Sequence, residues 1–200
     1  MLIATALCLT AYNLAEARRA AEAAEKALHE LAPPPAPTEV PQVEPEPEPE
    51  PVTPAYILDP KMEMPTQAVD GVEYIGVLEI PTLELELPII SEWSDNRLRL
   101  APCRYKGSAY LGDLIIAGHN YKTHFGRLRN LAEGDEVIFT DMADGRFTYT
   151  VSQVEQLPGT AIEEMEAGDW DLTLFTCAAG GTARLTVRCV RTGDERPISG

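Results

Sequence analysis

The chain has 200 residues, a length that suits one folded domain with appended segments. Its 32 acidic and 16 basic residues give a formal net charge of −16, and the Lys and Arg residues are scattered along the chain. Binding to a nucleic-acid backbone depends on dense Lys/Arg patches, so we expect no nucleic-acid partner.

The chain begins with an apolar segment. Residues 1–14 are almost wholly apolar, yet a helix needs ~20 residues to cross the hydrocarbon core of a membrane. We interpret this segment as a partial, uncleaved anchor of a single-pass membrane protein; an N-terminal core helix is the alternative. Arg18 and Arg19 follow this segment, and basic residues favour the cytoplasmic side of a membrane, which is the wrong side for an extracytoplasmic domain. Basic residues upstream of a longer N-terminus would resolve this conflict in orientation.

A helical stalk and a spacer are predicted next. Residues 15–32 are rich in Ala, Glu, Arg and Leu and contain no Gly or Pro, which favours a helix. Residues 33–60 are rich in Pro and Glu, with alternating Glu-Pro pairs at 44–51. Such a segment cannot bury a core, so we expect a disordered linker that is extended as polyproline II. A proline-rich recognition ligand is the alternative for this linker.

Residues 61–192 are predicted to form a mainly β domain, followed by a flexible tail at 193–200. Period-two or short apolar runs typical of strands occur at 83–87, 114–117, 137–139, 147–151, 172–175 and 185–187. Asp144-Gly145 predicts a hairpin turn between two of them. Helical turns are expected only at 130–133 and 161–167. Many short strands with few helices indicate an antiparallel or mixed barrel or sandwich.

Three histidines are candidates for proton transfer. His29 lies on the predicted stalk, and His124 lies in a polar loop, where we expect it at the surface. His119 follows an apolar strand in Ala117-Gly118-His119-Asn120, where a rigid strand end would present its imidazole at a cavity mouth. A histidine that only satisfies local hydrogen bonds is the alternative for His119.

The four cysteines lie at positions 8, 103, 177 and 189 and form no C-x-x-C pair, so we expect neither a metal site nor a cofactor. Cys177 ends a predicted strand and is followed by small residues, which makes it the candidate nucleophile. Cys103 and Cys189 are expected to be two separate buried thiols; a disulfide between them is the alternative.

Arg184 begins the last predicted strand, seven residues after Cys177, so the two strands can lie side by side. A guanidinium there would stabilise the negative charge of a tetrahedral intermediate. A surface ion pair is the other interpretation of Arg184. Arg188 is the alternative residue for the catalytic position. Further candidate substrate contacts are Asn120, Thr176 and Arg188.

Four separated motifs between Tyr74 and about Arg191 together resemble the sortase family. The segment Ile80 to Ile89 is similar to the opening strand pair of that family, and Ala117 to Asn120 is similar to its histidine motif. Leu172 to Cys177 contains its T-L-x-T-C motif, and Arg184 to Arg188 resembles the terminal R-x-x-V-R strand. The joint occurrence of the motifs in this order is far more specific than any one of them.

The resemblance implies an eight-stranded sortase-type β-barrel at the outer side of the cell membrane. It implies a transpeptidase that cleaves an L-P-x-T-G-like C-terminal sorting signal of a secreted protein. Cys177 would form a thioester, His119 would transfer protons, and Arg184 would stabilise the oxyanion and the substrate. The implied acceptor is an amine, such as that of a peptidoglycan precursor or a pilin lysine.

Two other function classes are the alternatives. One is a different cysteine acyl-transferase or peptidase that acts on cell-wall peptides. An L,D-transpeptidase carries Arg directly after its Cys, whereas Ala178 follows Cys177 here, and papain-like proteases place the Cys at the start of a helix. The other is a non-catalytic surface β-domain, for which the Cys, His and Arg arrangement would be coincidental.

Overall fold

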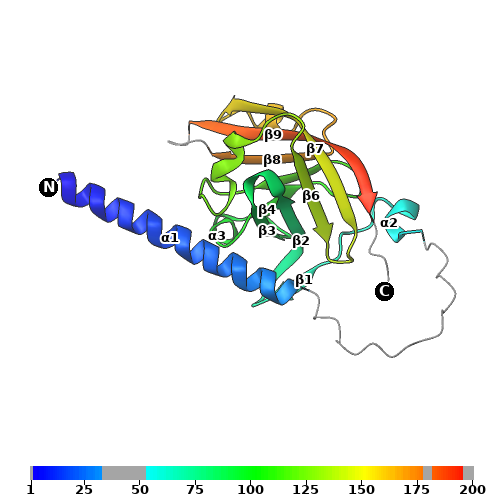
Figure 1. The fold of residues 1–200 in the computed structure, drawn as a ribbon, viewed down its shortest axis with the longest axis horizontal. Helices are drawn as coiled ribbons and strands as arrows, with labels where there is room; N and C mark the ends of the chain where they lie inside the picture. The colour runs from blue at the N-terminus through cyan, green and yellow to red at the C-terminus, as the bar shows by residue number, and fades with distance from the viewer. Residues whose placement is uncertain (1, 33–52, 178–181, 196–200) are drawn as a thin grey trace.

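The computed structural model describes residues 2–32, 53–177 and 182–195. Within them, eight strands form a closed β-barrel (Figure 1), which confirms the predicted fold class. Around the ring the order is β2 (Val72–Ile80), β3 (Leu85–Ile90), β4 (Cys103–Lys106), β5 (Leu114–Ala117), β8 (Leu172–Cys177), β9 (Ala183–Glu195), β7 (Arg146–Pro158) and β6 (Glu136–Asp141). Pairing of β6 with β2 closes the ring, and β1 (Gln67–Val69) adds outside it to β2.

Apolar side chains from alternate strand positions fill the interior of the barrel. Leu78, Phe139, Tyr149, Leu174 and Val187 are fully buried there. Closure depends on a glycine in β2, because Gly76 pairs with β3 on one side and β6 on the other. A Cβ at Gly76 would lie 2.2 Å from the Thr140 carbonyl oxygen, so only glycine fits this close approach.

The hairpin between β6 and β7 is built as its sequence predicts. Asp144 has a φ of 60°, a left-handed conformation that Asp tolerates in turns. The Asp141 carboxylate accepts hydrogen bonds from the amides of Ala143 and Gly145 at 2.8 Å each and from the Tyr110 hydroxyl at 2.6 Å. The predicted turn at Asp144-Gly145 is therefore confirmed.

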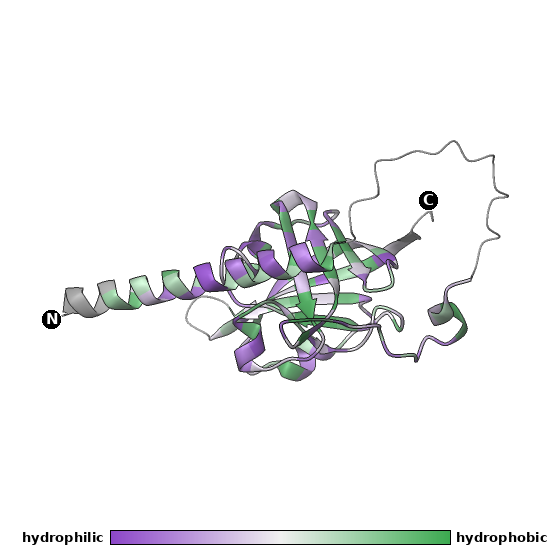
Figure 2. Cartoon of the chain, turned by 90° about the horizontal axis from the view of Figure 1, so that it is seen from below, coloured by the Kyte–Doolittle hydropathy of each residue, from purple (hydrophilic) through white to green (hydrophobic). Residues whose placement is uncertain are grey.

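The N-terminal helix is a single element, α1 (Leu2–Leu31), whose C-terminal half packs beside the barrel while its N-terminal half projects beyond it (Figure 1). Ala20, Ala24 and Ala27 are buried on one face of α1, because small side chains let the helix approach β1 and β3 closely. The Lys26 ammonium pairs with Asp70 beside β1. In Figure 2 the apolar residues of α1 gather toward its N-terminal half.

No helix within the described residues is long and apolar enough to cross a membrane. The partial anchor predicted for residues 1–14 stays a prediction.

The short helices close the ends and the outside of the barrel. They are α2 (Ala55–Leu58), η1 (Pro81–Leu83), α3 (Asp95–Leu98), η2 (Phe125–Asn130) and α4 (Ile162–Glu166). The turn predicted at 161–167 is α4, whereas the turn predicted at 130–133 occurs earlier in the chain, as η2. Tyr56 in α2 stacks on Tyr110 with ring centroids 4.7 Å apart, so the end of the predicted linker packs on the barrel. Residues 33–52 lie outside the described residues.

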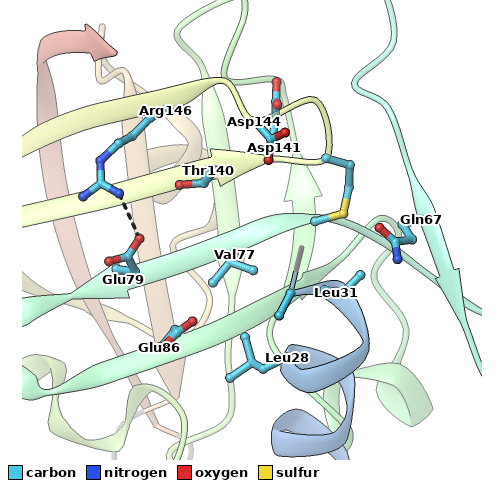
Figure 3. A pocket seen from close by; sticks show the side chains of 12 residues that line it. Leu28, Leu31, Gln67, Val77, Glu79, Glu86, Thr140, Asp141, Asp144 and Arg146 are labelled. Atoms are coloured by element: carbon cyan, nitrogen blue, oxygen red, sulfur yellow. Dashed lines mark hydrogen bonds and ion pairs between the residues drawn. The ribbon is translucent and has the colours of Figure 1, made fainter. Parts of the chain in front are cut away.

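A groove of about 470 Å³ separates the C-terminal end of α1 from strands β2, β3 and β6 (Figure 3). Leu28 and Leu31 of α1 face Val77 across it, and Arg146 pairs with Glu79 at 3.3 Å on its wall. In the ring order, β2 is four strands away from β8, so this groove lies on the opposite wall from Cys177.

Candidate active site

Three neighbouring strands present the three predicted catalytic residues at one end of the barrel. Strands β5 and β8 are parallel, with Ala117 opposite Phe175. The amide of Gly118 continues this ladder by donating to the Phe175 carbonyl at 3.0 Å. His119 and Cys177 each follow two residues later, so they leave the paired strands at the same edge and in the same register. Cys177 is in turn the direct register partner of Arg184 in β9.

Cys177 and Arg184 also share the outer face of the barrel. Alternate residues of a strand point to the same side, so Phe175 and Cys177 lie on one face, and directly opposed residues share a face across the pair. The Arg184 guanidinium carbon lies 5.6 Å from the centre of the Phe175 ring, on that face. Phe175 packs there with Ile115, Ala117 and Met165, which gives the site an apolar floor.

Exposure distinguishes Cys177 from the two cysteines of the core. Cys177 is exposed at the end of β8, whereas Cys103 and Cys189 are buried and unpaired. Burial raises the pKa of each of these two thiols to about 12, because an apolar environment disfavours the thiolate. The prediction of two separate buried thiols is confirmed. Cys8 on α1 is the other exposed thiol.

His119 is half-buried beside Tyr121, with ring centroids 4.8 Å apart. Burial lowers the pKa of His119 below its usual 6.5, and the nearby charge of Arg99 lowers it further. The carboxylates of Asp95 and Glu16 oppose these effects. The environment of His119 therefore favours the neutral imidazole at physiological pH.

The loop that follows β5 folds tightly back over the end of the barrel. A Cβ at Gly118 would lie 2.4 Å from the ring of Phe125, which is fully buried. The Phe125 amide donates to the His119 carbonyl at 3.0 Å. Glycine before His119 thus permits the contact that holds this loop.

The same loop buries His124, so the prediction of a surface position for this residue is wrong. His124 is 0% exposed, and neither of its ring nitrogens has a hydrogen-bond partner among the described residues. Burial lowers its pKa to about 4, with a smaller effect from His119. The polar residues before His124 suggested a solvated loop, but the imidazole is buried and lies beside the ring of Tyr121, with centroids 5.5 Å apart.

A small cavity adjoins Cys177 at the rim of the barrel. Its volume is about 200 Å³, and its lining includes two further predicted contact residues, Asn120 and Thr176. Asn120 is exposed, whereas Thr176 is 2% exposed. The remaining lining residues are Gly126, Arg129, Gln156 and Leu185. Sequence reasoning missed Arg129 and Gln156, since neither belongs to a recognisable motif.

Arg188 occupies a different environment from Arg184. It is 2% exposed, and its Nε donates to the Glu155 carboxylate at 2.8 Å. Its Nη1 and Nη2 donate to the carbonyl oxygens of Met165 and Glu164 at 2.6 and 2.7 Å. These partners occupy the guanidinium, so we assign Arg188 to the structure of the barrel and leave it out of the proposed substrate contacts.

Arg188 fastens α4 to the outside of the barrel. A helix of five residues has little stability of its own, and α4 is held from two strands. Arg188 binds its backbone from β9, while Lys106 of β4 binds its Glu166 at 2.6 Å. Between these contacts Met165 is fully buried against the apolar floor. Arg188 thereby positions one wall of the surface beside Phe175.

The two arginines of β9 should respond differently to substitution by lysine. With Arg184 in the predicted catalytic position, Arg184→Lys is expected to lower kcat by about 100-fold without changing the melting temperature, because lysine does not reproduce the planar, fixed donor. Arg188→Lys is expected to destabilise the fold by about 1–3 kcal/mol, because lysine cannot reproduce the forked hydrogen bonds. Thermal unfolding and steady-state kinetics on both variants test this contrast. The reverse pattern would assign the catalytic position to Arg188.

The fold and the rim geometry define a class of protein: a closed eight-stranded β-barrel with an exposed cysteine at the end of strand β8. The sequence profile of the Sortase domain matches residues 78–192, more than half of the chain. The chain belongs to the sortase family.

Two curated relatives and one solved structure illustrate the similarity. The chain is 27% identical to Sortase A of Bacillus anthracis over 123 residues, which are 58% of this chain and 58% of that protein. It is 31% identical to Sortase D of Bacillus subtilis (strain 168) over 107 residues, 51% of this chain and 53% of that protein. The chain thus spans about half the length of the curated relatives it matches.

The solved structure is Clostridium perfringens sortase C with the C-terminal cell wall sorting motif. It matches with a TM-score of 0.53 and 25% identity, over 64% of this chain and 77% of that chain.

Proposed function

We propose that the chain is a cell-surface sortase that cleaves an L-P-x-T-G-like C-terminal sorting signal of secreted proteins and joins the acyl part to an amine. The observation that carries the proposal is the register of the rim. Cys177 is paired with Arg184, and it ends a strand parallel to the one that leads into His119. A nucleophile, a proton carrier and a fixed cation on adjacent strands suit acyl transfer.

The proposed reaction has two halves. The Cys177 sulfur attacks the carbonyl carbon of the signal's threonine while the thiol proton passes to the neutral His119 imidazole, and Arg184 stabilises the negative charge on the carbonyl oxygen. The C–N bond breaks, and the leaving amine takes a proton from His119, which leaves a thioester on Cys177. An acceptor amine then attacks the thioester, its proton passes to His119, and the C–S bond breaks to release a new amide. His119 returns this proton to the departing Cys177 sulfur, which restores the thiol and the neutral imidazole. The thioester retains acyl-transfer potential, so no ATP is required.

The domain limits and the partners form part of the same proposal. Residues 61–192 are the proposed catalytic unit, together with the packed segment around α2, and residues 33–52 are the proposed spacer. The proposed donors are secreted proteins with a sorting signal, and the C. perfringens sortase C solved with a C-terminal cell wall sorting motif supports donors of this kind. The proposed acceptor is an amine of a peptidoglycan precursor or a pilin lysine.

The proposal predicts signal cleavage and acyl transfer by the purified full chain. A fluorogenic peptide with an L-P-x-T-G-like signal should be cut between threonine and glycine, and an added amine should appear in the product, as measured by fluorescence and mass spectrometry. A panel of peptides with related signals is tested as well, so that activity on a variant of the L-P-x-T-G motif is also detected. A chain that is folded by circular dichroism but neither cuts nor is acylated by any member of the panel would favour the non-catalytic surface domain.

A further inference from the structure

The rim cavity lies on the other side of the nucleophile from the apolar floor. Thr176 and Leu185, which line the cavity, are direct register partners. They point to the opposite face from Cys177 and Arg184, because adjacent strand residues alternate. Cys177 itself lines the cavity, so its thiol stands between two surfaces. A transpeptidase brings two substrates to one carbon, and the rim cavity offers space beside the thiol for one of them.

The two surfaces differ in polarity. The floor is a buried cluster of Ile115, Ala117, Met165 and Phe175, none of them more than 7% exposed, so it supports the strand end without offering space for a ligand. The cavity is lined by Asn120, Arg129 and Gln156, whose polar groups suit a hydrophilic ligand. Its volume of about 200 Å³ is below the roughly 300–1,000 Å³ of pockets that enclose a whole ligand. It therefore fits one terminal unit of an acceptor.

The charge of the cavity is opposite to that of the chain. Arg129 is exposed, and its Nε and Nη2 donate to the Gly126 carbonyl at 3.3 and 3.0 Å, which fixes the guanidinium on η2. Its Nη1 has no partner among the described residues. No Asp or Glu belongs to the described lining, although the chain carries a net charge of −16. A fixed arginine without an acidic neighbour favours a carboxylate ligand.

We propose that the rim cavity binds the acceptor, and that the preferred acceptor is an amine whose own carbon bears a carboxylate. This inference rests on the function proposed above. Arg129 binds the acceptor carboxylate and positions the amine for attack on the Cys177 thioester. The new C–N bond forms, the C–S bond breaks, and the amine proton passes through His119 while the carboxylate stays ionised. Arg129 is thus a positioning residue that selects the acceptor.

The test compares glycine with glycinamide as acceptors, because they differ in the carboxylate. The full chain and its Arg129→Gln variant are supplied with a signal peptide and each acceptor, and kcat/KM for the acceptor is measured from the transfer product. The wild-type ratio of glycine to glycinamide should fall at least tenfold in Arg129→Gln. Arg127→Gln is the matched control, because it removes the same charge from η2 outside the cavity lining, and it should keep the wild-type ratio.

Two results would overturn the inference. One is an unchanged ratio in Arg129→Gln, and the other is an equal fall in Arg127→Gln, which would mean that only the general charge of η2 matters. Hydrolysis of the peptide without acceptor is recorded in the same assays. Its complete absence in the wild type would instead contradict the proposed function, so the two failures can be told apart.

Discussion

Replacing Cys177 with alanine is expected to abolish both cleavage of the signal peptide and transfer to the amine. The loss should be complete within detection, because no other described side chain at the rim carries a nucleophilic sulfur. Melting temperature should not fall, since the thiol is exposed and fills no core space. Product formation by high-performance liquid chromatography, together with thermal unfolding, measures both quantities.

The matched control for this variant is Cys8→Ala. Cys8 is also exposed, but it lies on α1, so the Cys8→Ala protein should retain wild-type turnover. Residual turnover in Cys177→Ala that Cys8→Ala removes would transfer the nucleophile to the helix. Turnover unaffected by either substitution would end the thioester mechanism altogether.

Replacing His119 with alanine is expected to lower kcat by about 10²–10⁴-fold, the usual contribution of a positioned proton carrier. The parallel register of β5 and β8 places His119 level with Cys177. Without the imidazole, the leaving and entering amines have no side chain with which to exchange protons. His29→Ala on the exposed side of α1 is the control and should behave as wild type.

The pKa of His119 offers an independent check of its environment. Burial and Arg99 lower this pKa, so the imidazole signal should titrate in NMR with a midpoint below 6.5. A His119→Ala protein with wild-type kcat, or a His119 midpoint above 6.5, would show that its imidazole lies elsewhere than at the half-buried rim.

The sequence was sufficient for the parts of the fold that repeat locally. The run at 147–151 is a strand whose alternation matches one buried face, whereas the short apolar runs at 114–117 and 172–175 are strands buried on both faces. β4 was not predicted, because its segment Cys103–Lys106 is short and carries no clear alternation. The docking of α1 was also missed, since an alanine-rich face looks alike whether it contacts solvent or a sheet.

The candidate site divides in the same way. Cys177 and Arg184 could be placed together from their spacing and the strand period alone. The distinction between Arg184 and Arg188 required the partners of each guanidinium, which come from α4 and β7, distant in the chain. The cavity beside Arg129 depends on the packing of η2 against β8 and β9, and no local pattern specifies such a contact.

The central claim is that Cys177 carries the acyl group between the two halves of the reaction. The most direct measurement is mass spectrometry of the acid-quenched chain after brief mixing with a signal peptide, followed by peptide mapping. The account predicts a mass increase equal to the acyl fragment, localised to Cys177, that disappears when an acceptor amine is added. Cleavage of the signal with no covalent species, or an acyl group on another residue, would contradict it.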